Sequence, residues 1–147
     1  MPPESPPVDE CVDRLVATVR SWSGVRPTPH RFSGTAFLLG AREIGHVHRS
    51  GAVDVHFPHR VRELLRTVGP TAQRVDPESG WTTIRISSPG DVDDALGLLR
   101  VSYLYTASRL RHSPVGRDAL RTVDLDDELT ALDPGGDLRD AFDDAHV

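Results

Sequence analysis

Residues 43–57 read EIGHVHRSGAVDVHF, and this stretch alternates apolar and polar side chains on both sides of a turn that contains a glycine. Such alternation is typical of half-buried β-strands. A three-residue turn, 49–51, pairs His46 with Asp54 and keeps the apolar residues of both strands on one face, whereas a two-residue turn would set polar against apolar side chains. The longer turn also places Gly51 where a left-handed backbone is required. The stretch therefore predicts an antiparallel hairpin with one buried face.

Helical patterns flank this hairpin in the sequence. Apolar residues recur at intervals of three and four over residues 8–22, and Gly24 follows as a stop signal. The segment 58–69 begins with a proline, which suits the first turn of a short helix because its missing N–H is not needed there. Asp91 is placed to cap a long helix over residues 92–111.

Strand patterns fill the space between the helices. Residues 32–39 and 81–86 alternate in the manner of strands, and residues 72–75 are a further candidate strand. Residues 26–30 contain two prolines and are expected to be extended. Strands grouped between helices predict a single α+β domain, with a mainly antiparallel sheet flanked by helices.

Composition divides the chain into three parts. The length of 147 residues suits one domain. Residues 1–7 are rich in proline and are expected to be a disordered lead-in to a folded domain over residues 8–111. The remaining segment, 112–147, is acidic, since residues 118–147 hold ten acidic residues and two arginines. We expect it to be either a loosely packed appendage or a cover for the mildly basic body.

The charge and composition also exclude several classes of protein. The net charge of −5 and the acidic C-terminal segment give no electrostatic support to nucleic-acid binding. No apolar run is long enough to span a membrane, and the N-terminus lacks the pattern of a secretory signal. Cys11 is the only cysteine, so no internal disulfide can form. The expected compartment is the cytoplasm, and the oligomeric state stays open.

The predicted hairpin gathers four residues that can carry chemistry. Its register places His46, His48, Asp54 and His56 on one face, with His46 directly opposite Asp54. Asp54 could orient His46 as a general base. Alternatively, His46, His48 and His56 could hold a metal ion together with Asp54. A solvated polar face without chemistry is the third interpretation.

Other candidates depend on their position in the predicted elements. Strand alternation places Glu43 at the start of the strand, on the face opposite to His46. The hairpin register that pairs His46 with Asp54 also pairs Ile44 with His56. Trp81 closes a turn and is expected in the core rather than as a stacking surface. Tyr103 points inward from the long helix.

Taken together, several segments resemble the luciferase domain family, whose namesake is the luciferase of bioluminescent fungi. The similarity spans about residues 10–111, and the segments that carry it are Arg42–His48, Gly51 with Val53 and Asp54, Phe57-Pro58, Arg62 with Leu65, Pro77–Trp81 and Leu98–Tyr103. The resemblance is to a small prokaryotic member of the family. A looser similarity to double-wing domains of the MmcQ/YjbR type concerns the fold alone.

The resemblance implies an enzyme that oxidises a hydroxylated pyrone with molecular oxygen, without flavin, nucleotide or any other cofactor. It makes Glu43, His46, His48 and Asp54 the candidate catalytic residues. His56, Glu78, Trp81 and Tyr103 become candidates for binding an aromatic or enolic small molecule. A metal-dependent enzyme that uses His46, His48 and His56, and a non-catalytic module that binds a small molecule or a protein, are the alternatives.

Overall fold

Five strands form one antiparallel sheet in the computed structural model, which describes residues 7–67, 74 and 81–144. Each strand pairs with its neighbours in chain order, so the sheet is a simple meander. The strands are β1 (Val25–His30), β2 (Gly34–Leu39), β3 (Arg42–Val47), β4 (Ala52–His56) and β5 (Trp81–Arg85), with a short 3-10 turn, η1 (Arg31–Ser33), between β1 and β2. The predicted single α+β domain is confirmed.

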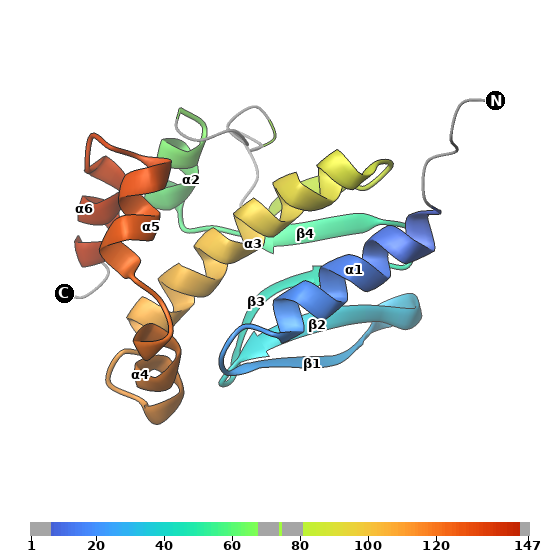
Figure 1. Ribbon diagram of the computed structural model, residues 1–147, viewed down its shortest axis with the longest axis horizontal. Helices are drawn as coiled ribbons and strands as arrows, with labels where there is room; N and C mark the ends of the chain where they lie inside the picture. The colour runs from blue at the N-terminus through green and yellow to red at the C-terminus, as the bar shows by residue number, and fades with distance from the viewer. Residues whose placement is uncertain (1–6, 68–73, 75–80, 145–147) are drawn as a thin grey trace.

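Two helices cover one face of this sheet, as Figure 1 shows. Helix α1 (Val8–Arg20) contacts β1 and β2, and the long helix α3 (Pro89–Arg109) contacts β2 to β5. The apolar stripe of α1 lies in the core, and Gly24 after it has a positive φ of 84°, which a glycine adopts without strain. The core therefore lies between the two helices and the inner face of the sheet.

The long helix begins earlier than the sequence predicted. Ser88 is its N-cap and Pro89 its first residue, while Asp91 lies in the first turn and completes a capping box with Ser88. A proline is favourable at this first position, and an acidic residue three positions after the cap satisfies free backbone N–H groups. Asp91 thus supports the helix start from inside the helix rather than as the cap itself.

Strand β1 accommodates two prolines because it lies at the edge of the sheet. Pro27 and Pro29 are two positions apart, so their nitrogen atoms point to the same side of the strand. The alternate residues keep their N–H groups for pairing with β2, which explains why the extended segment 26–30 is part of a sheet.

The predicted hairpin is confirmed at its turn. His46 pairs with Asp54 and Val47 with Val53, and Gly51 has a φ of 98°. Farther from the turn, β3 contains a β-bulge, because Phe37 of β2 faces Gly45 while the next residue of β2 faces Glu43. Pairing between β3 and β4 ends at His46 and Asp54, so the predicted Ile44–His56 pair does not form.

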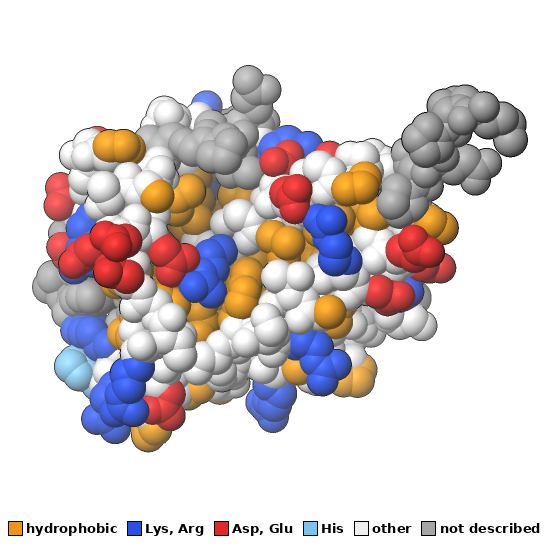
Figure 2. Space-filling model, viewed as in Figure 1, with side chains coloured by type: hydrophobic (Ala, Val, Ile, Leu, Met, Phe, Trp, Pro, Cys, Tyr) orange, Lys and Arg blue, Asp and Glu red, His pale blue; other side chains and the backbone are white. Residues whose placement is uncertain are grey.

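The C-terminal segment packs as three short helices: α4 (Pro114–Arg121), α5 (Leu125–Leu132) and α6 (Asp137–Asp144). Leu129, Leu138 and Phe142 are each at most 1% exposed and belong to the main core. Helix α6 also contacts α2 (His59–Leu65). Acidic side chains gather over the outer surface of these helices (Figure 2). This part of the chain is not loosely packed, while its separation from a domain over residues 8–111 remains a prediction.

Parts of two predictions lie outside the described residues. For the predicted disordered lead-in, residues 1–6 lie outside the described part of the chain. For the candidate strand 72–75, the structure describes Arg74 alone. Among the described helices, none combines the length and the apolar character that crossing a membrane requires.

Candidate functional site

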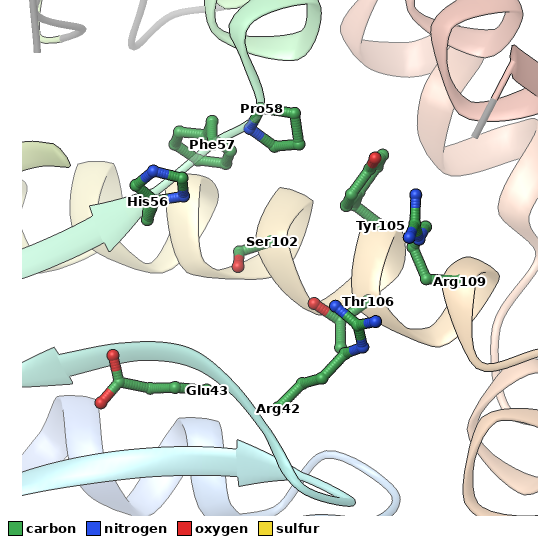
Figure 3. Close-up of a pocket in the computed structure, with 9 residues that line it drawn as sticks. All are labelled: Arg42, Glu43, His56, Phe57, Pro58, Ser102, Tyr105, Thr106 and Arg109. Carbon is green, nitrogen blue, oxygen red and sulfur yellow. The ribbon is translucent and has the colours of Figure 1, made fainter. Parts of the chain in front are cut away.

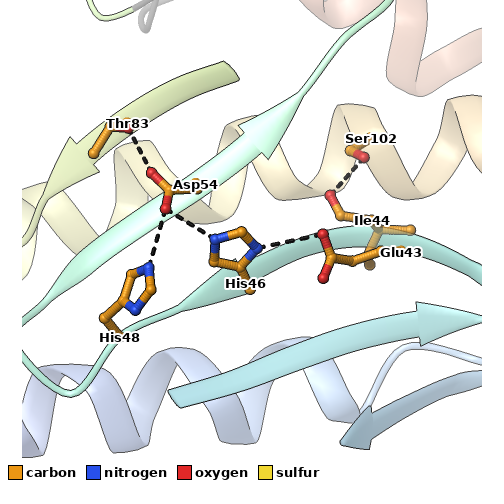
Figure 4. Close-up of polar contacts among 7 residues, drawn as sticks. All are labelled: Glu43, Ile44, His46, His48, Asp54, Thr83 and Ser102. Carbon is orange, nitrogen blue, oxygen red and sulfur yellow. Dashed lines mark hydrogen bonds and ion pairs between the residues drawn. The ribbon is translucent and has the colours of Figure 1, made fainter. Parts of the chain in front are cut away.

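The face of the sheet opposite to α1 and α3 carries a group of polar side chains, and Figure 4 shows those that come from β3, the residue after it, β4 and β5. Alternation places these residues on this face while their neighbours Val47, Val53 and Val55 lie in the core. We call the following residues the histidine cluster: His30 of β1, His46 of β3, His48 directly after β3, and Asp54 of β4.

Asp54 is the centre of the histidine cluster. Its Oδ2 atom lies 2.9 Å from His46 Nε2 and 3.2 Å from His48 Nε2. Thr83, which pairs with Asp54 in the neighbouring strand β5, donates its hydroxyl to Oδ1. Burial acts to raise the pKa of Asp54, but the hydrogen bonds from Thr83, His48 and His46 outweigh it and lower the pKa below its ordinary value. Asp54 is therefore held as a carboxylate between two imidazoles.

His46 lies between two carboxylates because of the bulge in β3. Ile44 and Gly45 both face α3, since Ile44 is buried and a Cβ at Gly45 would lie 2.5 Å from Leu99. This extra residue reverses the alternation, so Glu43 shares a face with His46. Glu43 Oε2 lies 3.3 Å from His46 Nδ1. The prediction that Glu43 faces away from His46 is therefore wrong.

His30 is a member of the histidine cluster that the sequence analysis missed. Its ring stacks on that of His46 with centroids 4.2 Å apart, and one nitrogen from each of His30, His46 and His48 lies within 4.8 Å of the others. The β2 residue that pairs with His30 is Gly34, so no side chain separates the rings. Burial and the neighbouring His46 lower the pKa of His30, which favours the neutral imidazole.

The position of His30 in the histidine cluster could have been predicted from the sequence if residues 25–39 had been aligned as a second hairpin. Pairing across the turn 31–33 sets His30 opposite Gly34 and thus on the face of His46. The two prolines hid this signal, because proline within a run argues against an ordinary strand.

The histidine cluster has the donor types and spacing of a transition-metal site. Two ligands about 2.1 Å from an ion at neighbouring corners of an octahedron lie about 3.0 Å apart. The distances from Asp54 Oδ2 to the two Nε2 atoms, 2.9 and 3.2 Å, are close to that value. His30 offers a third imidazole, one nitrogen of which lies within 4.8 Å of those of His46 and His48.

Trp81 and His56 form a second aromatic group beside the cluster. The two residues pair across β4 and β5, and their ring centroids are 5.2 Å apart. Trp81 is 43% exposed and its ring lies 5.4 Å from that of His46. The expectation of a core position for Trp81 is wrong, while its role in substrate binding stays a prediction. The structure does not bring His56 into the group of His30, His46 and His48.

A cleft of about 360 Å³ begins where β3 and β4 diverge, with α3 as its floor (Figure 3). Glu43 and His56 line it near the histidine cluster, while Arg42 and Arg109 lie toward its far end. Between these ends, Ser102 of α3 donates a hydrogen bond of 2.7 Å to the carbonyl oxygen of Ile44. This contact satisfies a backbone group near the point where β3 and β4 stop pairing.

Two candidates from the sequence lie elsewhere or cannot be placed. Tyr103 is fully buried on the helix side of the sheet, where its hydroxyl donates to the Ser23 carbonyl at 2.6 Å, and it is not part of the cluster or the cleft. Glu78 lies outside the described residues.

Comparison with known proteins identifies one family. A family model described as a luciferase domain matches residues 41–102, a segment that contains His46, His48 and Asp54. No curated protein and no solved structure matches the chain. The match over residues 41–102 supports the assignment of this segment to the luciferase domain family.

Proposed function

We propose that this protein binds a divalent transition-metal ion through the histidine cluster and uses it in an oxygen-dependent reaction of an enolic or phenolic small molecule. The observation that carries the proposal is the convergence of three imidazoles and one carboxylate, from β1, β3 with the residue after it, and β4, on the open face of the sheet.

The set of ligands favours metals that react with oxygen. Two histidines and one carboxylate with open positions are typical of non-haem iron(II) oxygenases, and imidazole also suits copper, zinc and nickel. His46, His48 and Asp54 would supply this set, with His30 as an additional ligand. Thr83 would act as the outer partner that fixes the carboxylate, as such partners commonly do in metal sites.

The contacts of His46 argue against its use as a free base. Both of its ring nitrogens face carboxylate oxygens, those of Glu43 and Asp54. A general base needs a ring nitrogen that reaches the substrate, and both nitrogens of His46 are already occupied by carboxylates. A metal ligand has no such need, because the nitrogen that faces Asp54 can give up its proton and bind a metal ion instead.

The family supplies the argument for oxygen as co-substrate. Its fungal namesake oxidises a hydroxylated pyrone with molecular oxygen, and a metal ion can hold such a hydroxyl as its anion. The anion is the electron-rich form from which oxygen can accept an electron. Trp81, exposed beside His46, offers a surface on which an aromatic ring can stack.

Metal-free oxygenase chemistry is the second candidate, and one contact favours it. His48 meets Asp54 through Nε2, and its Nδ1 has no hydrogen bond to the described residues. Asp54 would orient His48, whose Nδ1 would take the substrate proton. This mechanism places the base on His48 rather than on His46.

The test is the metal content of tag-free protein that has been purified without chelators, followed by titration with Fe(II), Mn(II), Co(II) and Zn(II). We expect one equivalent to bind. His30→Ala should lower the affinity by about tenfold or more, whereas His56→Ala, which removes a histidine of the same sheet face, should leave it unchanged. Circular dichroism would verify that both variants are folded.

Oxygen uptake with hydroxypyrones and phenols then separates the two candidates. Uptake that disappears on chelation and returns with metal supports the metal-dependent enzyme. Uptake by metal-free protein, abolished in His48→Ala, would replace it with the second candidate. Absence of specific metal binding together with absence of uptake would refute both.

A further inference from the structure

The cleft beside the histidine cluster has two chemically different ends. Glu43 and His56 lie at the end where they contact His46 and Trp81, respectively. Arg42 and Arg109 line the cleft toward its other end, on β3 and α3 (Figure 3). A molecule in the cleft would therefore meet Glu43 and His56 at the end beside the histidine cluster and two guanidinium groups at the other end.

The guanidinium groups of the two cleft arginines are not engaged by other side chains among the described residues. Arg14, Arg49, Arg66, Arg74, Arg100, Arg121 and Arg139 each form an ion pair. Arg42 and Arg109 form neither an ion pair nor a hydrogen bond with any residue that the structure describes. Glu43, the acidic residue of the cleft, is already in contact with His46. The positive charge at the arginine end is thus not neutralised by the described part of the chain.

The interior of the cleft adds a polar group suited to an anion. Thr106 on the floor is 7% exposed and its hydroxyl has no hydrogen bond to the described residues. An arginine guanidinium presents parallel N–H groups that match the two oxygen atoms of a carboxylate. Two such groups and a hydroxyl make a carboxylate the best fit for this end.

The volume limits the size of the occupant. Small-molecule sites range from about 300 to 1,000 Å³, so a cleft of about 360 Å³ belongs to the smallest of them. It has room for one substituted ring. An acid group held by the arginines would direct the opposite side of that ring toward Glu43 and His56, which contact His46 and Trp81, respectively.

From these observations we infer that the cleft binds the carboxylate of a single-ring aromatic or enolic acid, with Arg42 and Arg109 as the residues that select for the negative charge. The inference rests on the proposed function for the reaction at the ring, because it names the class of substrate for that same site. The binding itself requires no metal.

The probe is 4-hydroxybenzoate, and 4-hydroxybenzamide is its neutral control of almost equal shape. Titrations followed by ¹H–¹⁵N NMR should show the acid binding at the cleft, with shifts at Arg42, Ser102 and Thr106, and the amide binding about tenfold or more weakly. Arg42→Gln and Arg109→Gln should each weaken binding of the acid, and the double variant should bind acid and amide alike. Arg117→Gln, on α4 and outside the cleft, is the matched control and should bind as the unchanged protein does.

Equal binding of acid and amide, or an equal loss in Arg117→Gln, would overturn the inference, as would shifts outside the cleft. Metal content keeps this result separate from the proposed function. A metal-free protein that binds the acid through the two arginines supports the inference while the proposed function fails. A metal-loaded protein that does not distinguish acid from amide refutes the inference alone.

Discussion

The replacement Asp91→Asn tests the start of α3, the helix that forms the floor of the cleft and contacts four strands. Asp91 Oδ2 accepts hydrogen bonds from the backbone N–H groups of Ser87 and Ser88, at 2.9 and 3.2 Å, and from the Ser87 hydroxyl at 2.9 Å. Its Oδ1 lies 3.1 Å from an Arg74 nitrogen. The Ser87 contacts, with Arg74 as a further cause, lower the pKa of Asp91 from 3.8 to about 2.

This lowered pKa sets the size and the sign of the effect. Each pKa unit corresponds to about 1.4 kcal/mol, so the ionised side chain contributes about 2 kcal/mol to the free energy of unfolding. Because the folded-state pKa lies below the unfolded one, the contribution is complete above pH 4 or so and is lost as the pH falls through the folded pKa of about 2. At pH 3, about half of it should remain.

Urea unfolding at pH 7 and at pH 3 measures this contribution. Asp91→Asn should be about 2 kcal/mol less stable than the unchanged protein at pH 7, and the difference should shrink to about 1 kcal/mol at pH 3. Asp93→Asn is the matched control, since this neighbour is 74% exposed and pairs with Arg14 at the surface. It should cost less than about 1 kcal/mol. A loss for Asp91→Asn that is independent of pH, or no larger than that of the control, would refute the assignment.

Three further substitutions test the packing around the site by urea unfolding at pH 7. Ser102→Ala leaves the buried Ile44 carbonyl without its donor and should lower the free energy of unfolding by about 1–3 kcal/mol. Its control is Ser108→Ala, which removes a buried hydroxyl that has no hydrogen-bond partner among the described residues and should lower the free energy of unfolding by less. Equal losses of stability in the two variants would contradict this reasoning. Phe142→Ala should cost about 3–5 kcal/mol because the ring is fully buried, and a loss below about 1 kcal/mol would show that the C-terminal helices do not share the core. Tyr103→Phe should cost about 1 kcal/mol and leave metal binding unchanged, and altered metal content would place Tyr103 at the site after all.

The sequence predicted the centre of the site because a hairpin turn determines its register. Once a three-residue turn ends at Gly51, the pairing of His46 with Asp54 follows from the alternation alone, and His48 falls on the same face. This argument is local, since it involves residues within ten positions of one another. The same locality explains why the amphipathic stretch of α1 was identified correctly.

The remaining site residues depend on features that a regular period cannot reveal. His30 reaches the cluster across β2, so its position requires the register of a second hairpin that two prolines obscure. Glu43 required recognition of a bulge. A glycine inside a strand pattern is a sign of a bulge, and Gly45 was that sign. The exposure of Trp81 depends on which face of the sheet the helices cover, which alternation does not determine.

The bulge in β3 connects the two halves of the candidate site. By adding one residue at Ile44 and Gly45, it turns Glu43 toward His46 and so places a second carboxylate on that ring. The same addition ends the pairing of β3 with β4 at His46, and the cleft lies where the two strands separate. The carbonyl of Ile44, the extra residue of the bulge, accepts a hydrogen bond from the Ser102 hydroxyl of α3. One inserted residue thus accounts for the charge beside the histidine cluster and for the space in which a substrate would lie, as bulges beside functional sites often do.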